Sequence, residues 1–88
     1  MAAVATVETD RFPNIVRDPD IQGGTAVVRG TRLPVRAVAF YWREAGDRAR
    51  ILRSYPQLTP ELLDEATRYY EAHRAEIDEE LRAEDRLA

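Results

Sequence analysis

The stretch at residues 47–63, DRARILRSYPQLTPELL, holds the signals that decide the fold. Asp47 can cap a helix over Arg48–Ser54, because its carboxylate can accept a hydrogen bond from a backbone N–H in the first turn. Pro56 disfavours helical backbone at the residue before it and therefore ends that helix. Thr59-Pro60 is a typical start of a second helix. The stretch thus predicts two helices joined by a short turn.

A further helix is predicted just upstream, over Val35–Ala45. Pro34 suits its first position, and Gly46 stands where a glycine commonly ends a helix. One face carries apolar side chains at helical spacing: Val35, Val38, Ala39 and Trp42. Phe40 and Tyr41 fall on other faces, so this helix is apolar almost all round. A domain this small cannot bury it fully.

Upstream of that helix, the pattern favours a small β-hairpin. Arg11–Val16 and Ala26–Arg29 are short and contain β-branched residues, and Leu33 can add a third short strand. Gly23-Gly24 provides turn chemistry between the first two strands. A lone hairpin is unstable in water, so it must pack on the helices. Residues 1–10 are predicted to be a flexible tail.

Downstream of Pro60, no Gly or Pro interrupts the chain as far as Ala88. This permits one long helix, and we divide the chain into a domain at residues 11–76 and a charged helical extension at 77–88. An apolar stripe continues along the helix, but beyond Tyr70 it has little of its own domain to pack against. We therefore expect this part of the helix to bind a partner, through Tyr69, Tyr70, His73, Arg74, Ile77 and Leu81.

Together these elements predict a mainly α protein. It has three helices in a homeodomain-like helix-turn-helix arrangement, a small N-terminal hairpin and a long C-terminal helix. With 88 residues and no cysteine, the chain forms one domain with a marginal core and no disulfide. Such scaffolds often rely on oligomerisation, so we expect a homo-oligomer. No segment is apolar enough to span a membrane, and no positively charged leader opens the chain, so we expect a cytoplasmic protein.

The sequence lacks the residues that several kinds of catalytic and ligand-binding chemistry require. The chain has no lysine for a phosphate-binding loop, and with one histidine and no cysteine it has almost no nucleophile–base pairs. No His, Cys, Asp and Glu cluster has metal-ligand spacing. We expect no catalytic residue, no cofactor and no metal. His73 is predicted to be an interface or half-buried residue, with a ligand or base as the alternative.

Charge is distributed unevenly. Residues 23–58 hold seven Arg and two acids, whereas residues 59–88 hold four Arg and ten acids. If the helix-turn-helix binds DNA, we expect the contacts from Arg29, Arg32, Arg36, Arg48 and Arg50. Two observations leave this open: the helix after Thr59 begins with acids that repel phosphate, and each arginine can instead be solvated or pair with the acidic final helix. Three-helix units of this shape also serve as plain scaffolds.

Two runs resemble a known family. They are residues 21–35, IQGGTAVVRGTRLPV, and residues 51–61, ILRSYPQLTPE. Both are similar to hallmarks of the bacterial domain of unknown function 433 family, and the resemblance covers residues 14–76. Ala26 stands where the family often has proline. Gly30, Thr31 and Arg32 match the family motif, whose structural and DNA-contact readings are both open.

The resemblance implies a homeodomain-like three-helix fold with an N-terminal hairpin. It also implies a VapB-type antitoxin, which binds and neutralises a PIN-like ribonuclease toxin and often represses its own operon by binding operator DNA. A stand-alone helix-turn-helix DNA-binding regulator is the alternative. A third hypothesis is an assembly module that forms a homo-oligomer and neither binds DNA nor inhibits a toxin.

Overall fold

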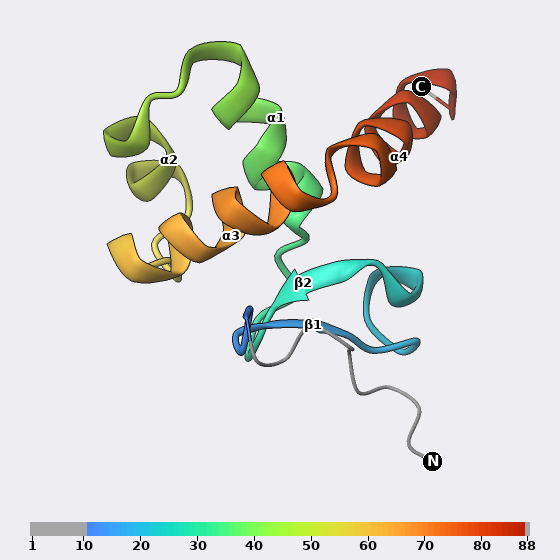
Figure 1. The fold of residues 1–88 in the computed structure, drawn as a ribbon, viewed down its shortest axis with the longest axis horizontal. Helices are drawn as coiled ribbons and strands as arrows, with labels where there is room; N and C mark the ends of the chain where they lie inside the picture. The colour runs from blue at the N-terminus through green and yellow to red at the C-terminus, as the bar shows by residue number, and fades with distance from the viewer. Residues whose placement is uncertain (1–10, 88) are drawn as a thin grey trace.

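The computed structural model describes residues 11–87; the predicted flexible tail at 1–10 lies outside them. Within this part the fold is mainly helical, with four α-helices and one small sheet (Figure 1). The elements in chain order are β1 (Ile15–Arg17), the 3-10 helix η1 (Gln22–Gly24), β2 (Ala26–Val28), α1 (Val35–Ala45), α2 (Arg48–Ser54), α3 (Pro60–Ala72) and α4 (Arg74–Leu87). In Figure 1, α3 crosses the middle of the molecule, with α2 on one side and the hairpin on the other.

The predicted hairpin is present, with shorter strands. β1 and β2 pair antiparallel, with Ile15 opposite Val28. The first strand begins later than predicted, and Phe12, which precedes it, is buried in the core instead. Gly23 and Gly24 lie in the connection with φ of +67° and +90°, a region that side chains rarely enter.

The signals at the helix ends act as predicted. The Asp47 carboxylate accepts from the backbone N–H of Arg50 at 3.1 Å, and the Thr59 hydroxyl accepts from that of Leu62 at 3.1 Å. Gly46 ends α1 in the left-handed conformation, with φ of +62°. These caps are local, so the same residues fix the ends of α1, α2 and α3 wherever the helices pack.

The prediction of one continuous helix from Pro60 onward is wrong. The chain breaks at His73, with φ of −127° and ψ of 35°, and α4 starts directly after it. The break turns α4 onto α1, where Ile77 and Leu81 are 1% and 8% exposed. Burying such a side chain stabilises the fold by about 1.5–3 kcal/mol, which outweighs the few helical hydrogen bonds lost at one break. α4 therefore packs as part of the domain.

The core lies between α1, α3 and the hairpin. α3 contributes fully buried side chains, among them Leu63 and Tyr70. Glu65, also on α3, is 6% exposed, and its two carboxylate oxygens accept from the backbone N–H and the side-chain amide of Asn14 at 2.7 and 3.0 Å. A buried carboxylate with two such donors is satisfied, so it ties the start of the hairpin to α3.

Candidate partner-binding surface

The most exposed large apolar side chains of the described part lie on α1. Phe40 and Tyr41 are 44% and 39% exposed, while Val35, Val38 and Ala39 fill the opposite, inner face. This follows from the sequence of α1, which is apolar on more faces than the core can cover. The rings of Phe40 and Tyr41 meet edge to face at 5.2 Å between centroids.

These rings form a ridge that continues onto the next segment. Tyr55, which caps the end of α2, lies with its ring centroid 6.3 Å from that of Tyr41 and is half-buried. Burial raises the pKa of Tyr55 above its usual range, with the nearby phenol of Tyr41 as a smaller cause. The phenol is thus neutral at physiological pH. We call Phe40, Tyr41 and Tyr55 the aromatic ridge.

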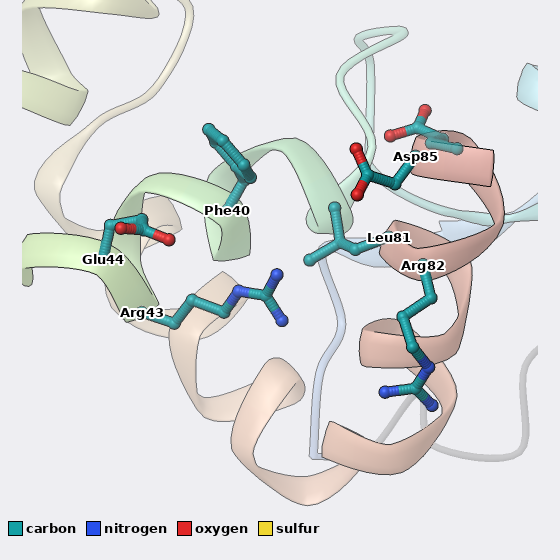
Figure 2. A pocket seen from close by; sticks show the side chains of 7 residues that line it. Phe40, Arg43, Glu44, Leu81, Arg82 and Asp85 are labelled. Carbon is teal, nitrogen blue, oxygen red and sulfur yellow. The ribbon is translucent and has the colours of Figure 1, made fainter. Parts of the chain in front are cut away.

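A groove runs between α1 and α4 on both sides of Phe40. Its first part, about 380 Å³, extends toward Arg43 and Glu44 of α1 and Asp85 of α4. Its second part, about 280 Å³, extends toward the rest of the aromatic ridge. Phe40, Leu81 and Glu84 line both parts. Figure 2 shows Phe40 on α1 and Leu81 on α4, with the Arg43 side chain reaching from α1 toward α4, Glu44 at the far end of α1 and Asp85 above Leu81.

Ion pairs between α1 and α4 hold the groove walls together. Arg36 donates to the Glu84 carboxylate at 2.8 Å, and Arg43 donates to that of Asp78 at 2.9 Å. Asp78 also accepts from the Tyr70 hydroxyl at 2.8 Å. Burial raises the pKa of Tyr70, and this hydrogen bond adds to the effect. Asp78 and Glu84 of α4 thus pair with arginines of α1.

The arginines predicted to contact DNA do not form one surface. Arg29 donates to the Pro13 carbonyl at 2.8 and 3.0 Å within the hairpin, and the side chain of Arg36 is only 16% exposed. Arg48 pairs with an α3 carboxylate, that of Asp64. Arg29 and Arg32 lie in the hairpin region and Arg48 in α2, and Figure 1 places these at opposite sides of α3.

Two of the predicted DNA-contact residues keep exposed side chains. Within residues 11–87, the guanidinium groups of Arg32 and Arg50 make no hydrogen bond or ion pair. The same holds for Arg53, one turn further along α2 than Arg50. Arg50 and Arg53 are therefore a small cationic patch on α2.

The residues predicted to bind a partner are mostly internal. Tyr69, Tyr70, Ile77 and Leu81 are all less than 9% exposed. The expectation that this stripe lacks a partner in its own domain is therefore wrong, because the break at His73 folds it onto α1 and the hairpin.

His73 and Arg74 lie nearer the surface. The His73 ring is half-buried, stacked on Tyr69 with centroids 4.0 Å apart, which agrees with the predicted half-buried role. Arg74 is exposed and lies over the Tyr70 ring at 5.0 Å, paired with Glu71 at 2.5 Å. Both contacts are local to the junction of α3 and α4.

Sequence reasoning did not assign the groove. Its signal was present in the apolar excess of α1, which leaves Phe40 and Tyr41 outside the core. The other wall could not be found this way, because α4 was expected to extend away from α1. Asp85 was thus assigned to the charged helical extension at 77–88.

Residues 11–87 hold neither a metal-binding cluster nor a membrane-spanning helix. No three or more His, Cys, Asp or Glu side chains of residues 11–87 are grouped so that they could hold a metal ion. Among the helices in the same range, none has the length and apolar character needed to cross a membrane.

Comparison with known proteins shows which proteins the chain is similar to and which family it belongs to. An uncharacterised protein, y4eO of Sinorhizobium fredii (strain NBRC 101917 / NGR234), is 42% identical over 59 residues, which are 67% of this chain and 27% of that protein. The chain thus spans about a quarter of this relative. The crystal structure of a DUF433 member protein from Anabaena variabilis ATCC 29413 superposes with a TM-score of 0.72 at 31% identity, covering 91% of this chain and 87% of that one. Residues 15–70 match the family described as "Protein of unknown function (DUF433)", and the chain belongs to this family.

Proposed function

We propose that this chain is an antitoxin that binds and neutralises a PIN-like ribonuclease toxin in the cytoplasm, and that it has no catalytic activity of its own. The observation that carries the proposal is the aromatic ridge beside the α1–α4 groove. Exposed aromatic side chains next to a groove are typical of protein–protein interfaces. The resemblance of the two sequence runs to the family supplies the class of partner.

We propose the exposed face of α1 as the contact, in place of the predicted stripe on α3 and α4. Tyr69, Tyr70 and Ile77 hold the core together and are not available without unfolding. Phe40 and Tyr41 are available without any rearrangement. A partner that covers them removes two large apolar side chains from water, which favours association.

Co-expression with the product of the neighbouring gene tests this proposal. We expect the wild-type chain to rescue growth and to co-purify with that product. Phe40→Ala/Tyr41→Ala should lose both effects while keeping the wild-type circular dichroism spectrum and melting temperature, because both side chains lie outside the core. Arg50→Ala/Arg53→Ala, a double change on another exposed surface, should keep both effects. Rescue by the aromatic double variant at wild-type strength would refute the proposal.

Repression of its own operon, or regulation of DNA without a toxin, is the second candidate. The observation that favours it is that Arg50 and Arg53 on α2 are exposed and their guanidinium groups make no hydrogen bond or ion pair within residues 11–87. Glu61 opposes it, because this exposed acid opens α3, the second helix of the helix-turn-helix. A mobility-shift titration with the upstream DNA should show affinity that falls steeply with salt and falls again in Arg50→Ala/Arg53→Ala. Absence of binding at low salt would remove this candidate.

A further inference from the structure

We infer that the α1–α4 groove accepts one class of ligand: an amphipathic helix of a partner protein whose apolar stripe is bordered by Lys or Arg residues. This deepens the proposed function, on which it rests, by naming the kind of toxin segment that contacts the groove. Three features carry the inference: the apolar side chains Phe40 and Leu81 in the groove, the acids beside them that have no partner within residues 11–87, and the helix ends that lie nearby.

The groove has two hollows on either side of one ring, the first lined mainly by charged side chains and the second mainly by apolar ones. Phe40 stands between them, and Leu81, although 8% exposed, lines both. Helices that bind in grooves place apolar side chains at i, i+3 or i+4 and i+7 against the apolar side chains of the groove, which here are Phe40 and Leu81. The α1 helix is 11 residues long, or about 16 Å at 1.5 Å per residue. A partner helix of two or three turns fits that length.

When the ion pairs within the chain are counted as neutral, the charge that remains beside the groove is negative. The charge of each arginine that lines the groove is balanced by a carboxylate of α4: Arg43 pairs with Asp78 and Arg82 with Glu79, both at 2.9 Å. By contrast, Glu44 and Asp85 have no hydrogen-bond or ion-pair partner within residues 11–87. They lie on either side of Phe40 (Figure 2), where the flanks of a bound helix would pass.

The C-terminal ends of α1 and α4 add further negative charge beside the groove. α1 ends at Ala45 and α4 at Leu87, each within three residues of an unpaired acid. The C-terminal end of a helix carries about half a negative charge on its free carbonyl groups. Cations are therefore favoured at both ends of the groove, and the ring faces of the ridge add cation–π attraction. An acidic helix or a phosphate backbone would be repelled at the same positions.

A designed peptide tests the inference directly. The probe is a fluorescein-labelled helical peptide with a Leu stripe bordered by Lys; a second peptide replaces every Lys with Glu. Fluorescence anisotropy with the full chain at low salt should show saturable binding of the Lys peptide and none of the Glu peptide. Phe40→Ala should weaken Lys-peptide binding by roughly ten-fold or more, because a central aromatic side chain commonly dominates an interface.

The charge variants give the matched control. Glu44→Gln/Asp85→Asn should weaken Lys-peptide binding about three- to ten-fold, as expected for two partly screened charge pairs. Asp20→Asn/Glu61→Gln removes the same charge from exposed acids that do not line the groove, and should leave binding within about two-fold, since distant exposed charges are screened. Thermal melts check that each variant is folded. Equal binding of both peptides, no binding of the Lys peptide, or equal effects of the two double variants would overturn the inference.

The outcomes separate this inference from the proposed function. If Phe40→Ala/Tyr41→Ala abolishes rescue but the Lys peptide does not bind, the inference fails and the antitoxin proposal stands. If the Lys peptide binds as expected but the wild-type chain rescues nothing, the antitoxin proposal fails and the groove chemistry stands. A second copy as the occupant would appear as a dimer in light scattering that Phe40→Ala dissociates, and it would overturn the inference.

Discussion

Replacement of Ile77 by Ala tests whether α4 belongs to the folded domain. Ile77 is 1% exposed and part of the core cluster. The change removes three carbon groups, each worth about 0.8 kcal/mol in transfer from water, and leaves a cavity that raises the loss to about 2–5 kcal/mol. Alanine is the better helix former, so any loss of stability must come from packing. A chain of 88 residues has only about 4–13 kcal/mol of stability in total.

Urea unfolding followed by circular dichroism measures this loss, and a thermal scan gives a second reading. A loss of about 3 kcal/mol should lower the melting temperature by about 12–24 °C in a domain of this size. Arg82→Ala, an exposed change on the same helix, is the control and should alter stability by less than about 0.5 kcal/mol. If Ile77→Ala were as mild as this control, α4 would be a free extension and the groove would lack its second wall.

Three further predictions concern residues that stabilise the fold. Glu65→Gln should lose about 1–3 kcal/mol in urea unfolding, because the amide cannot accept from both donors of Asn14 and leaves one without its partner. Gly46→Ala should lose about 1–2 kcal/mol in the same assay, because its left-handed φ of +62° strains a Cβ, and Gly46→Asn should lose less. Burial raises the pKa of Tyr70 above its usual 10.0, so its stabilisation is fully present below pH 10 and lost as pH rises through the raised value. Stability measured against pH should fall in that range for wild type and fall less for Tyr70→Phe.

The ends of α1, α2 and α3 could be predicted because their signals are local. Asp47 and Thr59 each satisfy an N–H three residues away, and Gly46 needs no neighbour beyond α1 to adopt its conformation. The hairpin could also be predicted from the sequence, but the residues at which its strands begin and end could not. Strand pairing depends on register, and only the buried positions of Phe12 and Ile15 in the core decide which residues begin the strand.

The break at His73 could not be predicted from local sequence. Neither Gly nor Pro marks it, and the residues around it are compatible with a helix. It is favoured by contacts that form only in three dimensions, such as Ile77 in the core and Arg36 against Glu84, which are 48 positions apart. The sign of the charges on the two segments was visible in the sequence, but their pairing across α1 and α4 was not.

Burial, more than ion pairing, decides which charged residues remain available to a partner. An exposed ion pair contributes only about 0–1 kcal/mol, so Arg48 can leave Asp64 at small cost and turn to a ligand. Arg36 cannot do so, because its side chain is 16% exposed and lies between two carboxylates of α4. Its removal would leave acids without a cation and loosen the groove wall. An Arg36→Ala variant that loses partner binding therefore indicates damage to the wall, whereas the same loss in Phe40→Ala indicates loss of a contact.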